Sequence, residues 1–101
     1  MKQTDDANFK IDVLDRDFVV VDFYADWCGP CRMILPFLEE IQNELAIEIV
    51  KVNIDNSPAI ASQYEVMSIP TLIIFKKGEK VSVNVGAASK ARLIDWINSH
   101  Q

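Results

Sequence analysis

The sequence has little cysteine, histidine, glycine or proline: its 101 residues include two, one, three and four of these, respectively. Two cysteines make a thin disulfide framework for a small secreted protein, so we expect a reducing compartment, the cytoplasm. Scarce glycine and proline, together with a hydrophobic content of 50%, indicate an ordinary folded globule. The length suits one compact domain over residues 1–101.

Basic residues are outnumbered as well, with 10 lysines and arginines against 15 aspartates and glutamates and a net charge of −5. Nucleic acid and anionic lipid both demand a basic face, so we expect neither as a partner. The longest apolar run, from Ile69 to Phe75, is too short to span a bilayer and contains a proline. The first ten residues lack the apolar region of a secretory signal.

What the sequence does contain is an alternation of strand and helix patterns. The predicted strands cover residues 18–24, 47–55, 71–75 and 80–85. Four helices are predicted. The first follows a cap at Thr4, the second runs from Gly29 to near Leu45, the third follows a cap at Asn56-Ser57-Pro58, and the fourth follows a cap at Ser89. Only Met1 to Gln3 precede the first helix, so a strand there is short.

This order of elements predicts an α/β fold. The early alternation implies parallel strands with helices on both faces, whereas the last two strands, joined by a tight turn at Gly78, add an antiparallel hairpin. The expected architecture is a central mixed β-sheet flanked by four helices.

The two cysteines, Cys28 and Cys31, are separated by Gly29-Pro30 and lie where a buried strand ends and a helix begins. Zinc would need more ligands than the remaining His100 offers, so we expect no metal. Covalent haem attachment would need a histidine at the position of Arg32. A purely structural disulfide would stabilise the fold by only about 2 kcal/mol, because the loop that it closes is short.

Redox chemistry is the interpretation that we favour over these three. Cys28 would lie at a helix N-terminus, where free N–H groups and the helix dipole stabilise the thiolate, the nucleophile of disulfide exchange. Cys31, one turn into the helix, would be more shielded yet within bonding reach, as a resolving thiol must be. Asp22 interrupts the strand just before them, where an unpaired carboxylate costs several kcal/mol.

Five stretches resemble the thioredoxin family, in the family's order: "VDFYADWCGPCR" at 21–32, "KVNID" at 51–55, "SIPT" at 68–71, "FKKGE" at 75–79 and "VGAASK" at 85–90. The resemblance covers nearly the whole chain and implies the thioredoxin fold. It implies a monomeric protein-disulfide reductase without further cofactor, in which Cys28 attacks a client disulfide and Cys31 resolves the mixed disulfide. A thioredoxin reductase would recycle it. Tyr24 stands where many family members carry a second tryptophan.

The resemblance also implies roles for residues around the cysteines. Asp22 would be a buried proton acceptor for Cys31, with a raised pKa; the alternative is a structural carboxylate paired with Lys51. Lys51 itself would either modulate Asp22 or be a solvated strand residue. Pro70 would be a cis-proline that aims the backbone of Ile69 at an extended substrate, and otherwise a strand-start proline.

A client-binding surface is the last expectation. Trp27, directly before the first cysteine, would be partly exposed and not a core aromatic, whereas Trp96 suits the core. The apolar, nearly uncharged surface would consist of Trp27, Gly29, Pro30, Ile69, Gly86 and Ala87.

Two other functions compete with that of a reductant: a binding subunit with idle thiols, and a disulfide oxidase or isomerase. Asp22, Lys51 and Pro70 beside both cysteines favour an enzyme. Gly29-Pro30 resembles the reducing members of the family, because oxidising relatives carry a histidine between the cysteines.

Overall fold

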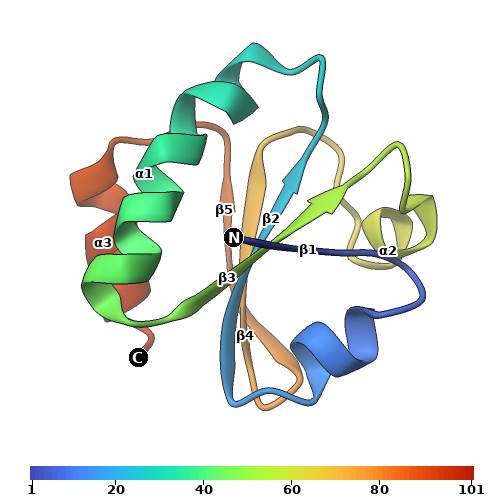
Figure 1. The fold of residues 1–101 in the computed structure, drawn as a ribbon, viewed down its shortest axis with the longest axis horizontal. Helices are drawn as coiled ribbons and strands as arrows, with labels where there is room; N and C mark the ends of the chain where they lie inside the picture. The colour runs from blue at the N-terminus through green and yellow to red at the C-terminus, as the bar shows by residue number, and fades with distance from the viewer.

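Strands and helices alternate along the chain up to a closing hairpin (Figure 1), and the computed structural model describes all 101 residues. The strands are β1 (Lys2–Thr4), β2 (Phe18–Tyr24), β3 (Glu48–Asn53), β4 (Thr71–Lys76) and β5 (Glu79–Val85). The helices are the π-helical turn η1 (Lys10–Leu14), α1 (Gly29–Leu45), α2 (Pro58–Gln63) and α3 (Lys90–Asn98). None of them combines the length and the hydrophobicity that a membrane crossing requires. The predicted order of elements is confirmed, including the short first strand.

The five strands form one mixed sheet in the order β1-β3-β2-β4-β5. β1 and β2 both pair with β3 in parallel, whereas β4 pairs antiparallel with β2 and with β5. The α/β architecture predicted from the sequence is therefore confirmed. β2 occupies the centre of the sheet, so its carboxyl end, where the cysteines follow, is held by a strand on each side.

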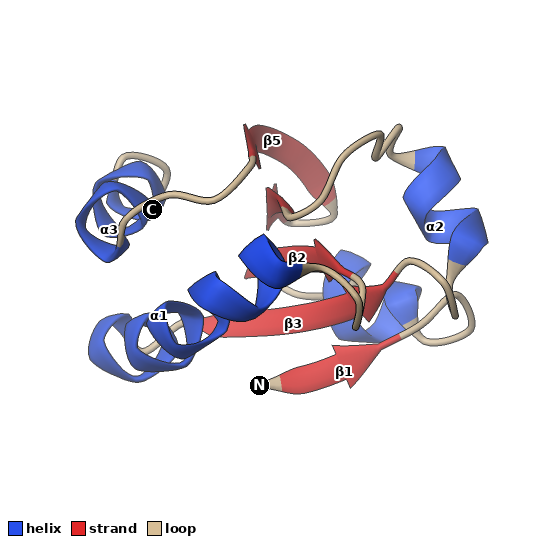
Figure 2. Ribbon diagram, turned by 90° about the horizontal axis from the view of Figure 1, so that it is seen from above, coloured by secondary structure: helices blue, strands red, loops and turns tan.

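Helices cover both faces of the sheet (Figure 2), with α1 and α3 on one side and η1 and α2 on the other. Each face has its own hydrophobic cluster. The α1/α3 face buries Val20, Ile34, Leu38, Ile41, Ile49, Leu72, Ile74, Leu93 and Ile97. The η1/α2 face buries Phe9, Val13, Val19, Val21, Phe23, Val50, Val52, Ile60, Ala61, Ile73 and Phe75.

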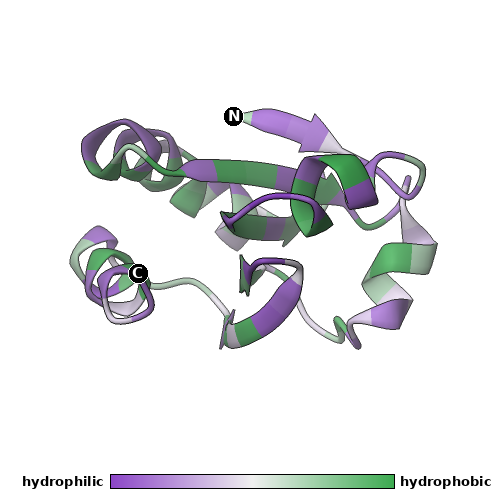
Figure 3. Cartoon of the chain, turned by 90° about the horizontal axis from the view of Figure 1, so that it is seen from below, coloured by the Kyte–Doolittle hydropathy of each residue, from purple (hydrophilic) through white to green (hydrophobic).

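The sequence of β2 explains its central place. A strand covered on both faces needs apolar side chains in both directions, and Phe18 to Phe23 supply them except at Asp22. Figure 3 shows the same contrast as colour: β2 is mostly hydrophobic, β3 carries both hydrophobic and hydrophilic bands, and the edge strand β1 is hydrophilic. Asp22 is thus a charged residue type at the centre of an otherwise apolar strand.

One predicted helix cap is wrong, and another is confirmed in position but lacks the expected side-chain bond. Thr4 ends β1 instead of capping a helix. In the turn that follows, the backbone N–H of Asn8 donates to Oδ1 of Asp5 over 2.9 Å. Ser57 is the N-cap residue of α2, as predicted, but its side chain makes no capping bond and its buried hydroxyl has no hydrogen-bond partner. The carboxylate of Asp6 makes the side-chain capping bond instead, because its Oδ1 accepts from the N–H of Ile60 over 2.9 Å.

The other local predictions are confirmed. Ser89 caps α3, since its Oγ accepts from the N–H of Arg92 over 3.2 Å. Gly78 has a φ of +83° in the β4–β5 turn, which a two-residue hairpin of this kind requires. A Cβ there would lie 2.8 Å from the carbonyl oxygen of Leu14, so the turn also packs closely against the end of η1.

Candidate active site

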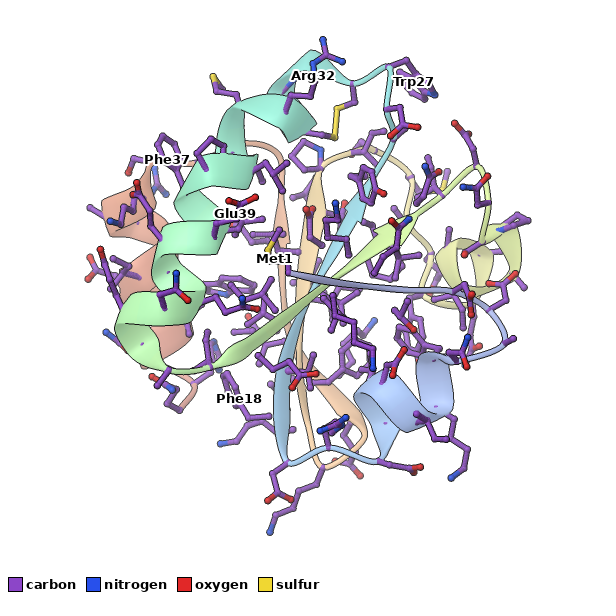
Figure 4. All side chains as sticks on the ribbon, in the orientation of Figure 1. Met1, Phe18, Trp27, Arg32, Phe37 and Glu39 are labelled. Atoms are coloured by element: carbon purple, nitrogen blue, oxygen red, sulfur yellow. A yellow bond between two sulfur atoms is a disulfide. The ribbon has the colours of Figure 1, made fainter.

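The two cysteines lie between the carboxyl end of β2 and the first turn of α1, near the labelled Trp27 and Arg32 in Figure 4. They form a disulfide, with 5.3 Å between their Cα atoms. Cys28 is the N-cap of α1, and its Sγ accepts a hydrogen bond from the backbone N–H of Cys31 over 3.1 Å. This N–H and the helix dipole favour negative charge on the Cys28 sulfur once the disulfide opens.

Exposure does not distinguish the two cysteines. Cys28 is 5% exposed and Cys31 is 3% exposed, so the difference in shielding expected from the sequence is nearly absent in the disulfide form. The reason is that the chain around Ile69 covers Cys28: the carbonyl oxygen of Ile69 lies 3.9 Å from its Sγ. What sets Cys28 apart is therefore its position at the helix terminus.

A loop from a distant part of the sequence meets the disulfide. The Ile69–Pro70 peptide bond is cis, as the resemblance implies, and Pro70 is buried. The N–H of Gly86 donates to the carbonyl oxygen of Pro70 over 2.8 Å, so the segment after β5 joins the same loop. Ile69, Pro70 and Gly86 are thus brought together from two segments, and Ala87 follows them on the surface.

Trp27 is 67% exposed, which confirms that it is not a core residue. Its indole N–H donates to Oδ2 of Asp55 over 2.9 Å, so the segment after β3 fixes the orientation of the ring. Gly29 and Pro30 are exposed beside it in the sequence. Sequence reasoning did not single out Asp55, because a contact across 28 positions leaves no local pattern.

Two exposed methionines were also missed. Met33 follows Arg32 in the first turns of α1, and Met67 stands two residues before Ile69. Neither belongs to a motif, and a lone exposed apolar residue is unremarkable in a sequence. Each is close in sequence to a residue of the site, and their exposed, flexible thioethers add apolar surface without adding charge.

Asp22 is 1% exposed at the centre of β2. It forms no ion pair, and its Oδ1 has no hydrogen-bond partner. Burial therefore raises the pKa of Asp22 to about 7, and the positive charge of Lys51 offsets this only in part. The raised pKa expected from the sequence is confirmed, whereas a carboxylate paired with Lys51 is not what the structure contains.

Asp22 borders a cavity of about 230 Å³ that also reaches Cys31. The lining residues are Asp22, Tyr24, Ala25, Asp26, Cys31, Arg32, Leu35 and Lys51. Such a cavity has room for water, whose share of the liquid is about 30 Å³ per molecule. A carboxyl group with a near-neutral pKa and the second cysteine therefore share one small, partly polar space.

Lys51 and Tyr24 form one wall of this cavity. The Nζ of Lys51 lies 5.2 Å from the centroid of the Tyr24 ring, within the range of a cation–π interaction. Burial is the main reason why the pKa of Tyr24 is raised, and the negative charge of Asp26 adds to it. Tyr24, Asp26 and Arg32 were given no role by sequence reasoning.

The rest of the molecule offers no comparable constellation. Two larger and more open hollows lie at the opposite end of β2 and β3, around Phe18, Ile47 and Glu48. No group of three or more histidine, cysteine, aspartate or glutamate side chains is arranged to hold a metal ion. Only here does an acid with a near-neutral pKa, Asp22, lie close to a pair of cysteines.

Comparison with known proteins agrees with this geometry. A model of the family described as Thioredoxin matches residues 1–99. Thioredoxin 1 of Nostoc sp. is 52% identical over 101 residues, which cover 97% of this chain and 94% of the relative. The corresponding values are 47% over 96 residues, 92% and 91% for thioredoxin of Rickettsia typhi, and 46% over 103 residues, 99% and 96% for thioredoxin of Pyropia yezoensis. With its Cys28–Cys31 disulfide at a helix terminus, the chain belongs to the thioredoxin family of thiol–disulfide oxidoreductases.

Proposed function

We propose that this protein reduces disulfides in client proteins and is returned to the dithiol form by a thioredoxin reductase. The observation that carries the proposal is the cavity in which the unpaired carboxyl group of Asp22 meets the resolving cysteine, Cys31, behind the helix-capping Cys28. The protein acts as a monomer in the cytoplasm in this proposal.

The first step is attack by Cys28. Its thiolate, stabilised at the N-terminus of α1, forms a bond to one sulfur of the client disulfide, and the other client sulfur leaves as a thiolate. Apolar surface around Trp27, Gly29 and Pro30 holds the client, and the backbone of Ile69 pairs with its extended chain beside cis-Pro70. Gly86 and Ala87 complete the contact.

The second step is resolution by Cys31. Its thiol transfers its proton to the carboxylate of Asp22, through water in the shared cavity, and its sulfur attacks Cys28. The bond between Cys28 and the client breaks, the client sulfur takes the electron pair, and the Cys28–Cys31 disulfide forms again. The client has gained two electrons, which the reductase must replace. Lys51, Gly29 and Pro30 tune these steps.

Trapping experiments test the assignment of the two cysteines. Cys31→Ser should hold clients as stable mixed disulfides through Cys28, because no thiol remains to resolve them. The matched variant Cys28→Ser should hold almost none. Mass spectrometry that finds trapped partners on Cys31 would reverse the assignment.

The direction of the reaction needs a separate measurement. Equilibrating the protein with graded dithiol buffers and measuring the oxidised fraction gives the midpoint of the Cys28–Cys31 couple. A strongly reducing midpoint is the expected result for a reductant. A midpoint near that of disulfide oxidases would replace the proposal with oxidation or isomerisation.

A further inference from the structure

The side chain of Lys51 leaves the backbone directly beside that of Asp22. In the parallel pairing of β2 with β3, the two residues are register partners, and Tyr24 is two positions along β2 from Asp22. Side chains of register partners on neighbouring strands point to the same face and start about 5 Å apart. The long stem of Lys51 therefore has both the carboxyl group and the Tyr24 ring within its reach.

The ammonium group lies at the ring and not at the carboxyl group. Lys51 Nζ is 5.2 Å from the centroid of Tyr24, and it forms no ion pair within 4.0 Å of any carboxylate. The face of an aromatic ring attracts a cation through its quadrupole, and this attraction is stronger where water is scarce, as it is for half-buried side chains. Lys51 and Tyr24 are both half-buried.

We propose that Tyr24 is a positioning residue whose ring holds the ammonium group of Lys51 away from Asp22, so that the carboxyl group stays unpaired and faces the cavity shared with Cys31. The inference rests on the proposed role of Asp22 as proton acceptor. It assigns to Tyr24 the function of keeping that acceptor available, although Tyr24 touches no reacting atom.

The other groups around Asp22 leave Lys51 as the cation that matters. Arg32, from α1, is turned toward the rim, because its guanidinium donates to the carbonyl oxygen of Asp26 over 2.6 Å. The Asp26 carboxylate is exposed, and the neighbour of Asp22 on β4 is the neutral Leu72. The charge of Lys51 is correspondingly the one that lowers the pKa of Asp22.

Losing the ring should release Lys51 toward Asp22. In Tyr24→Leu, the freed ammonium pairs with the carboxylate and lowers the pKa of Asp22 by about 1, the lower end of the effect of an opposite charge at close range. Tyr24→Phe keeps the ring face and should leave the pKa unchanged. NMR of aspartate carboxyl carbons in ¹³C-labelled protein, followed against pH, measures the pKa of Asp22 directly.

A double-mutant cycle separates positioning from a change in burial. Lys51→Met removes the cation. Adding Tyr24→Leu to Lys51→Met should therefore leave the pKa of Asp22 unchanged from its value in Lys51→Met alone. An equal shift with and without Lys51 would overturn the proposal, because Tyr24 would then act through burial. So would an equal shift in Tyr24→Leu and Tyr24→Phe, because the hydroxyl would then be responsible.

The unmodified protein provides a second measurement that requires no variant to fold. A lysine held over an aromatic face has upfield-shifted ε-methylene protons, so Lys51 should show this shift, and its absence would overturn the proposal. None of these measurements depends on client reduction. If the trapping experiment fails while the pKa of Asp22 responds as expected, the proposed function is wrong and the positioning role of Tyr24 stands.

Discussion

Asp12 and Asp22 are both buried aspartates, with exposed fractions of 3% and 1%, yet their ionisation differs in direction. Asp12, in η1, has Lys2 Nζ at 2.8 Å from its Oδ1, and this contact holds its pKa below the ordinary value. Asp22, in β2, has no such partner, and burial raises its pKa to about 7. Burial alone therefore does not decide whether a carboxyl group is charged; the position of the nearest cation does.

The comparison also separates two uses of a buried acid. The Asp12–Lys2 contact joins η1 to the edge strand β1, which is only three residues long and pairs with β3 alone. Asp22 joins no two elements, because the cation whose charge acts on it, Lys51, lies over Tyr24. An acid that stabilises the fold is paired, whereas an acid proposed to move a proton is left unpaired.

Replacing Asp22 should have the largest effect on stability. The folded pKa of about 7 exceeds the unfolded value, so the stability present below pH 4 is lost as pH rises to 7, and the penalty is constant above that. Removing the charge in Asp22→Asn should raise the free energy of unfolding at pH 8 by up to roughly 4 kcal/mol, and by little below pH 4. Denaturant midpoints across pH measure this gain, and a loss of stability at pH 8 would make Asp22 a structural residue.

Replacing Asp12 should have a smaller effect of opposite sign. Its lowered pKa contributes stability that is present above the unfolded pKa of about 3.9 and is lost as pH falls through the folded pKa. Because Lys2 is 53% exposed and the pair is partly screened, Asp12→Asn should cost only about 1 kcal/mol at pH 7. The same pH series measures this loss of stability. If Asp12→Asn were stabilising at pH 8, as is expected of Asp22→Asn, the two aspartates would not differ in their effect on stability.

Salt should produce the smallest difference between the two sites. In 1 M NaCl, the cost of Asp12→Asn should shrink by a few tenths of a kcal/mol, because ions screen a pair with a half-exposed lysine. The gain in Asp22→Asn arises from burial and should stay nearly constant. Urea midpoints at low and high salt make the comparison, and a gain at Asp22 that follows the salt would indicate a charge–charge origin.

The sequence predicts what depends on neighbouring residues. The apolar run of β2, the helical spacing of α1, the Ser89 cap and the Gly78 turn are local patterns, and all four are confirmed. The cysteine pair and the buried position of Asp22 follow from the same kind of pattern, because a strand–turn–helix junction is local too.

Contacts between distant segments are what the sequence does not predict. Asp6 makes the side-chain capping bond of α2 across 54 positions, where the hydroxyl of Ser57 makes none, and Asp55 binds Trp27 across 28. The difference between Asp12 and Asp22 likewise depends on contacts between separate segments. The partner of Asp12 comes from β1, and Lys51, on β3, leaves Asp22 unpaired because it lies over the ring of Tyr24 on β2.

The rate of resolution tests the central claim, that the unpaired Asp22 takes the proton of Cys31. When the reduced protein reacts with a small aromatic disulfide that releases a coloured thiolate, the first release reports attack by Cys28 and the second reports resolution by Cys31. In the unmodified protein, and in Asp12→Asn as control, the second rate should rise with pH and level off above about 7, where Asp22 is ionised. In Asp22→Asn that inflection should vanish and the second rate at pH 7 should fall on the order of 100-fold, with the first release little changed. An unchanged second rate with its inflection retained would contradict the account.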